Sequence, residues 1–184
     1  MPWSLPNTLT WARIAAIPLI VLLFYMPYPW ADPAAGLLFA AAGVTDSLDG
    51  YFARRLGQIS RLGAFLDPVA DKLIVAVALV LLVSRDARAL IVLTAAVIIG
   101  REITISALRE WMAEIGARAK VAVSQLGKYK TILQIIGLSM MLYRVPLLGL
   151  PIYRLGVALI EVAAAATLLS MALYLRTAWP ELKR

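Results

Sequence analysis

The sequence predicts an all-α membrane protein, with six transmembrane helices around a polar cavity that opens to the cytoplasm. Hydrophobic residues make up 62% of the 184 positions and charged residues 16%, whereas about a quarter of the residues in soluble domains are charged. Apolar segments recur along the whole chain, and Lys and Arg are unevenly shared between their ends. At roughly 20 residues per span, six spans use most of the chain. Residues 1–184 are therefore expected to form a single membrane domain.

The spans differ in how clearly the sequence marks them. Residues 14–31 carry no charge and are long enough to cross a bilayer. Five shorter uncharged runs each continue at one end into a segment with few charges. Because a charge at membrane depth normally faces the interior of a bundle, these ends are expected to face a shared polar cavity. The five further helices are predicted at residues 33–56, 61–84, 87–111, 128–145 and 152–176.

The distribution of Lys and Arg predicts the orientation of the spans. With the N-terminus in the cytoplasm, fourteen of the eighteen Lys and Arg residues lie at or toward the cytoplasmic ends of the helices. An excess of Lys and Arg on that side is typical of membrane proteins. The link at about residues 57–60 would then be cytoplasmic. The four cations expected on the outer side are Arg85, Arg88, Arg144 and Arg154.

The composition excludes several classes of chemistry. The chain has no cysteine and no histidine, so disulfides, thiolate nucleophiles, zinc fingers and imidazole bases are ruled out. A metal site must use oxygen ligands, which favour Mg²⁺, Mn²⁺ or Ca²⁺, and a general base must be a carboxylate, Lys or Tyr. The formal net charge of +7 fits cationic loops beside anionic lipid better than a nucleic-acid partner.

Four aspartates lie close together in this apolar sequence. Asp46 and Asp49 are spaced i, i+3, and Asp67 and Asp71 are spaced i, i+4, so each pair shares one face of its helix. If the second and third helices form an antiparallel hairpin, the pairs converge and the ionised carboxylates repel one another strongly. Either raised pKa values or bound divalent cations can offset that repulsion. Two divalent cations match four negative charges, and paired metal ions suit displacement at phosphorus.

The residues between the aspartates fit a phosphate-bearing substrate. Gly50 and Gly63 have no side chain, so a ligand can approach the backbone, and Ala53 keeps the adjacent turn narrow. Arg54 and Arg55 offer forked donors to phosphate oxygens. The segment therefore predicts a site where divalent cations and a phosphate-bearing substrate meet.

Eight residues of this segment occur at fixed spacing: Asp46-x2-Asp49-Gly50-x2-Ala53-Arg54-x8-Gly63-x3-Asp67-x3-Asp71. This pattern resembles the signature of the CDP-alcohol phosphatidyltransferase family, and every fixed position is filled. Residues 6–13, 100–114 and 121–134 extend the resemblance over nearly the whole chain, to family members that use glycerol 3-phosphate as the acceptor.

The resemblance implies a six-helix enzyme of the bacterial inner membrane, usually a homodimer, whose active site faces the cytoplasm. The implied reaction moves the phosphatidyl group from CDP-diacylglycerol to sn-glycerol 3-phosphate and releases CMP. Two Mg²⁺ or Mn²⁺ ions would be held by Asp46, Asp49, Asp67 and Asp71, with Asp71 also acting as the base. The residues expected to bind the CDP-lipid are Asp49, Gly50, Ala53, Arg54 and Gly63.

The acceptor carries a phosphate of its own, which cations must hold. Arg101 is the strongest candidate because it follows a long apolar run, although a structural pair with the adjacent Glu102 is the plain alternative. Further along the chain, other cations lie near the inner ends of the fourth and fifth helices. The full set of candidates for this phosphate is Arg101, Arg109, Arg118, Lys128 and Lys130.

The first predicted span is preceded by polar residues. Thr8 and Thr10 are expected to cap its helix or to contact the nucleotide. Arg13 is interpreted only as one of the cytoplasmic cations.

Other functions remain open from the sequence. A cardiolipin, phosphatidylserine or phosphatidylinositol-phosphate synthase of the same family would carry the same signature. A cation transporter predicts acidic residues in both halves of the bilayer, whereas these acids concentrate on one side beside Arg and Gly. A basic membrane scaffold leaves the carboxylate spacing unexplained.

Overall fold

The computed structural model describes residues 5–56, 61–116 and 125–182, and this part of the chain is all-α as predicted. Six helices follow one another, with links of a few residues wherever a link is described. Their bounds are α1 (Leu5–Tyr25), α2 (Ala31–Leu56), α3 (Arg61–Arg85), α4 (Ala89–Glu114), α5 (Gln125–Tyr143) and α6 (Ile152–Leu182).

The two terminal helices are longer than the sequence predicts. α1 begins at Leu5 instead of residue 14, so Thr8 and Thr10 lie inside the helix and the expected capping role is wrong. The polar residues are tolerated because Thr10 and Arg13 face the interior, with only 1% and 2% of their surface exposed. α6 continues to Leu182, past the predicted end at residue 176.

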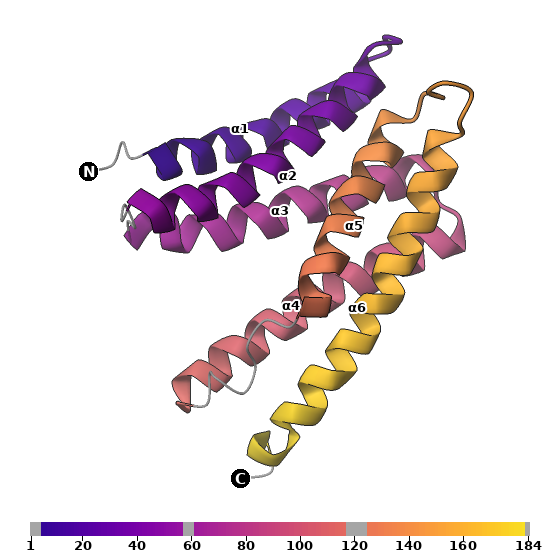
Figure 1. Ribbon diagram of the computed structural model, residues 1–184. Helices are drawn as coiled ribbons and strands as arrows, with labels where there is room; N and C mark the ends of the chain where they lie inside the picture. Colours follow the sequence, from indigo (N-terminus) through magenta and orange to yellow (C-terminus); the bar gives the residue numbers. More distant parts are fainter. Residues whose placement is uncertain (1–4, 57–60, 117–124, 183–184) are drawn as a thin grey trace.

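α1, α2 and α3 lie side by side, and α5 and α6 form an antiparallel hairpin (Figure 1). This hairpin packs against α2 through α5 and against α4 through α6. The links between α1 and α2, α3 and α4, and α5 and α6 gather on one side of the molecule (Figure 1). There Arg85 donates to Asp32 at 2.6 Å, and Tyr153 donates to Asp86 at 2.5 Å. Those contacts tie α3 to α2 and the residue 86–88 link to α6.

Two glycines allow α5 and α6 to approach backbone to backbone. A Cβ atom placed on Gly156 would lie 2.8 Å from the carbonyl oxygen of Gly137 and 2.9 Å from Cγ of Met141. Small residues at such crossings are typical of helix packing in membranes, where close van der Waals contact drives association. The glycine pair therefore sets the distance at which α6 packs on α5.

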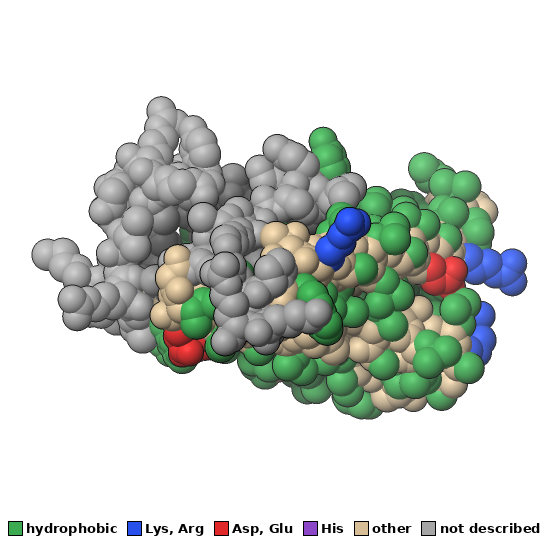
Figure 2. Space-filling view, turned by 90° about the horizontal axis from the view of Figure 1, so that it is seen from below, with side chains coloured by type: hydrophobic (Ala, Val, Ile, Leu, Met, Phe, Trp, Pro, Cys, Tyr) green, Lys and Arg blue, Asp and Glu red, His purple; other side chains and the backbone are tan. Residues whose placement is uncertain are grey.

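The outer surface is apolar. Three of the described helices contain a stretch long and apolar enough to cross a membrane: α1 from Thr8, α4, and α6 up to Trp179. Figure 2 shows hydrophobic side chains over much of the described face, with charged groups at only a few positions. Large contiguous apolar surfaces indicate contact with lipid or protein. The helices therefore indicate a membrane protein.

Candidate active site

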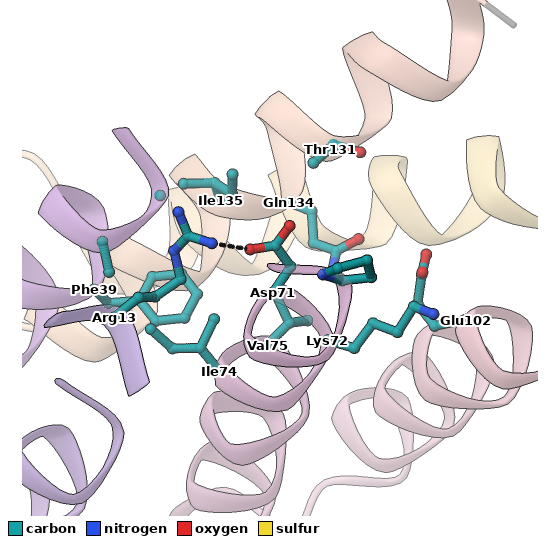
Figure 3. A pocket seen from close by; sticks show the side chains of 13 residues that line it. Arg13, Phe39, Asp71, Lys72, Ile74, Val75, Glu102, Thr131, Gln134 and Ile135 are labelled. Atoms are coloured by element: carbon teal, nitrogen blue, oxygen red, sulfur yellow. Dashed lines mark hydrogen bonds and ion pairs between the residues drawn. The ribbon is translucent and has the colours of Figure 1, made fainter. Parts of the chain in front are cut away.

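A cavity of about 260 Å³ lies among α1, α2, α3, α4 and α5, and Asp71 lines it (Figure 3). Asp67 lies one turn before Asp71 on α3, so both carboxylates come from one helical face, as their spacing predicts. Apolar side chains, among them Phe39 and Ile74, form part of the wall. The polar residues of the wall are Arg13, Asp71, Lys72, Glu102, Thr131 and Gln134.

Two side chains of α1 hold the α3 carboxylates. The hydroxyl of Thr10 donates to Oδ1 of Asp67, and the guanidinium of Arg13 donates to Oδ1 of Asp71 in an ion pair (Figure 3). Thr10 and Arg13 are spaced i, i+3 and meet acids spaced i, i+4, because α1 packs along α3. The side chain of Asp71 is 40% exposed, so this carboxylate is paired and still open to the cavity.

The other two aspartates belong to the last turns of α2. Asp46 and Asp49 lie in the part of α2 that leads into the link to α3, and α2 contacts α3. Their side chains lie outside the described residues, as do those of Ala53 and Arg54, and the surroundings of Gly50 are not described either. On α3, Gly63 is buried.

Carboxylate oxygens fit hard divalent cations, and the chain contains no histidine or cysteine that would bind softer metals. Within the described residues no group of three acids is close enough to hold a metal, and two of the four aspartates lie outside this set. The structure therefore describes the side chains of two of the four predicted metal ligands, Asp67 and Asp71.

An ionic cluster joins α4, α5 and α6. Lys130 donates to Oε1 of Glu102 at 3.1 Å, and Arg101 donates to the same oxygen at 2.5 Å and to Oγ of Ser170 at 3.1 Å. Arg101 and Lys130 are buried, with 6% and 3% of their surface exposed. Arg101, predicted as the strongest phosphate ligand, is therefore held in a structural pair, and it is Glu102 that lines the cavity.

Of the remaining predicted phosphate ligands, only Arg109 has a side chain within the described residues. Arg109 donates to the hydroxyl of Tyr174 at 3.1 Å and lies over its ring, so it ties α4 to α6. Lys128 is in the first turn of α5, and its side chain is outside the described residues. Arg118 falls outside the described residues altogether.

A second, mostly apolar cavity of about 450 Å³ lies between α3 and α4. Lys72 and Glu102 line both cavities, so the cavity that holds the ionic side chains of Arg13 and Asp71 meets a second, almost wholly apolar cavity beside these two residues. Such a junction suits a ligand that has a charged head and an apolar body.

Sequence reasoning missed three residues of this region. The sequence predicts Arg13 only as a cytoplasmic cation, Thr10 as a helix cap or a contact to the nucleotide, and Glu102 only as a partner for Arg101. One signal was present in the sequence: Thr10 and Arg13 share one helix face with the spacing needed to meet two acids one turn apart.

Comparison with known proteins shows the family of this chain. The family model for CDP-alcohol phosphatidyltransferase matches residues 3–175. The chain is 51% identical to the CDP-diacylglycerol–glycerol-3-phosphate 3-phosphatidyltransferase of Pseudomonas fluorescens, over 98% of this chain and 92% of that protein. It is 48% identical to the proteins of the same name from Escherichia coli strain K12 and Shigella flexneri, over 99% of this chain and 98% of each relative. This chain therefore belongs to the CDP-alcohol phosphatidyltransferase family.

Proposed function

We propose that the protein transfers the phosphatidyl group of CDP-diacylglycerol to sn-glycerol 3-phosphate, giving phosphatidylglycerol phosphate and CMP. The observation that carries this proposal is the placement of Asp67 and Asp71 on one face of α3, with Asp71 lining a cavity beside other charged and polar side chains. The acceptor is inferred from relatives that are 48–51% identical over nearly the full chain and are named for this reaction.

Asp46, Asp49, Asp67 and Asp71 would hold two divalent cations, Mg²⁺ or Mn²⁺. When bound, such ions neutralise phosphate oxygens and favour displacement at phosphorus. Hard carboxylate oxygens are the ligands that these ions prefer, and the chain offers no softer nitrogen or sulfur ligand of the usual kinds.

Asp71 would act as the general base. Its carboxylate accepts the proton of the acceptor hydroxyl while the acceptor oxygen bonds to the phosphorus next to diacylglycerol. The bond from that phosphorus to the oxygen of CMP breaks, and CMP leaves with the electron pair. The partial exposure of Asp71 to the cavity supports this role, because a base must be within hydrogen-bond reach of the proton that it removes.

The end of α2 and the start of α3 would bind the CDP-lipid. Asp49, Gly50, Ala53, Arg54 and Gly63 are the residues proposed for it, with Arg54 as a forked donor to phosphate oxygens. The apolar cavity beside Lys72 adjoins the cavity lined by Arg13 and Asp71, which supports a substrate with a charged head and acyl chains.

The phosphate of glycerol 3-phosphate would be bound by cations of α4, α5 and the segment between them, namely Arg101, Arg109, Arg118, Lys128 and Lys130. Lys130 and Arg101 already share Glu102, which lines the cavity. A bound phosphate would therefore compete with this carboxylate for the same two cations.

We further propose that all six helices span the bacterial inner membrane, that the site faces the cytoplasm, and that the protein is a homodimer in contact with membrane lipids. The excess of Lys and Arg at one end of the helices supports this orientation. The three apolar helices and the exposed apolar surface support the membrane location.

The acceptor can be tested directly. Protein purified in detergent with Mg²⁺ and CDP-diacylglycerol is offered glycerol 3-phosphate, serine, inositol phosphate or phosphatidylglycerol in separate assays of CMP release. We expect release with glycerol 3-phosphate alone. Release with serine, inositol phosphate or phosphatidylglycerol, and none with glycerol 3-phosphate, would assign the protein to another reaction of the family.

A further inference from the structure

Arg13 is paired with the carboxylate of Asp71, on which the proposed chemistry depends. Its side chain comes from α1, is 2% exposed, lines the same cavity as Asp71 and forms an ion pair with Asp71 on α3 (Figure 3). The hydroxyl of Thr10, one turn earlier on α1, donates a hydrogen bond to the carboxylate of Asp67. The eight-residue signature includes neither of these α1 residues, although both lie in residues 6–13, over which the resemblance extends.

A guanidinium and a divalent cation compete for the same carboxylate. In the structure Arg13 donates to Oδ1 of Asp71, so the negative charge of Asp71 is balanced within the protein. A divalent cation that binds Asp71 would lie within a few ångströms of this guanidinium, and like charges at that separation repel strongly in a partly buried site. The positive charge of Arg13 therefore weakens metal binding at Asp71 until the guanidinium pairs with another anion.

We propose that Arg13 is the built-in counter-cation of Asp71, and that it passes to the diphosphate of the CDP-lipid when divalent cations bind. This proposal rests on the proposed function. A planar guanidinium suits the transfer, because its forked N–H donors bind phosphate oxygens in pairs. Metal binding and diphosphate binding are then coupled through Arg13, and the coupling is reciprocal.

The test measures Mn²⁺ binding to the full-length protein in detergent by electron paramagnetic resonance, without nucleotide or lipid substrate. Arg13→Gln removes the charge and keeps a hydrogen-bond donor, so we expect Mn²⁺ to bind about tenfold more tightly than in the unmodified protein. Arg85→Gln is the matched control, because it breaks another interhelical Arg–Asp pair, with Asp32, at the far end of α3. Its affinity for Mn²⁺ should not change.

If Arg13 only supports the fold, its replacement should leave Mn²⁺ affinity unchanged or weaken it. Unchanged or weaker Mn²⁺ binding in Arg13→Gln, with unfolding as in the unmodified protein, would overturn the proposal. If Arg13→Gln does not fold, Arg13→Lys decides, because lysine keeps the charge and loses the fork. We then expect Mn²⁺ affinity as in the unmodified protein and a KM for CDP-diacylglycerol raised about tenfold; an unchanged KM would contradict the transfer to diphosphate.

The outcome separates this inference from the proposed function. If Arg13→Gln binds Mn²⁺ more tightly, yet the unmodified protein releases no CMP with glycerol 3-phosphate, the inference holds and the proposed reaction is refuted. A protein that releases CMP normally, while Arg13→Gln leaves Mn²⁺ affinity unchanged, keeps the reaction and refutes the role of Arg13.

Discussion

Lys130 on α5 places its ammonium nitrogen 3.1 Å from Oε1 of Glu102 on α4, and the neighbouring Arg101 donates to the same oxygen. One internal carboxylate thus balances two of the cations proposed to bind the acceptor phosphate. Because Glu102 also lines the cavity, we expect a phosphate that binds there to compete with this carboxylate for the two cations.

Removal of the negative charge of Glu102 should strengthen the binding of glycerol 3-phosphate. We expect Glu102→Gln to lower the KM for glycerol 3-phosphate about fivefold, because the phosphate no longer competes with a tethered anion. Initial rates of CMP release at saturating CDP-diacylglycerol measure this value. Glu110→Gln, an exposed position on the same helix, is the control and should leave the KM unchanged. A raised KM in Glu102→Gln would mean that Glu102 helps to bind the acceptor.

Loss of the positive charge of Lys130 should weaken the binding of glycerol 3-phosphate. Lys130→Ala is expected to raise the KM for glycerol 3-phosphate about tenfold and to leave the KM for CDP-diacylglycerol within about twofold, because the lost contact serves one substrate only. Arg176→Ala removes an exposed cation from α6 and serves as the control. Equal increases of both KM values would show that Lys130 does not discriminate between the substrates.

The contact between α5 and α6 can be tested through its glycines. Gly156→Ala places a methyl group 2.8 Å from the carbonyl oxygen of Gly137, so the helices must separate, at a cost of about 1–3 kcal/mol. Thermal unfolding in detergent should occur at a lower temperature. Gly100→Ala on α4 is the matched control, since its Cβ meets no atom within 4 Å and alanine favours a helix. Equal stability of the two variants would exclude a tight crossing at Gly156.

The link between α3 and α4 predicts a dependence of stability on pH. Hydrogen bonds from Arg88 and from the Tyr153 hydroxyl hold the pKa of Asp86 well below its usual value of 3.8. A carboxyl with a lowered pKa in the folded state stabilises that state above its unfolded pKa, and the contribution is lost as the pH falls. Asp86→Asn should therefore unfold at a lower temperature than the unmodified protein at about pH 6, and the difference should shrink below about pH 4.

The control for this measurement is Glu114→Gln, which removes an exposed acid at the other end of α4. A difference between Asp86→Asn and the unmodified protein that stays constant down to about pH 3 would contradict the assignment.

The helices and the shared helix face of Asp67 and Asp71 could be predicted from the sequence because both depend on local patterns. Apolar runs marked the middle of each helix, and the spacing of Asp67 and Asp71 marked the face of α3 that meets the cavity. The start of α1 could not be predicted by hydropathy, because Thr10 and Arg13 are polar. They are buried only because their partners lie 57 and 58 residues further along the chain.

The same reason explains why the acceptor ligands were harder to predict. Arg101 is buried through Ser170, which is 69 residues away, and Lys130 through Glu102, which is 28 residues away. A list of cations near helix ends cannot tell which of them already has an internal partner. That distinction requires the packing of α4, α5 and α6.

The most direct test of the account is the turnover of Asp71→Asn in the presence of Mg²⁺, CDP-diacylglycerol and glycerol 3-phosphate. Because Asp71 is proposed both as base and as metal ligand, CMP release should fall at least about a thousandfold while CDP-diacylglycerol binding stays measurable. Asp32→Asn, which breaks a salt bridge to Arg85 at the far end of α3, should retain its turnover. Near-normal turnover in Asp71→Asn would contradict the account.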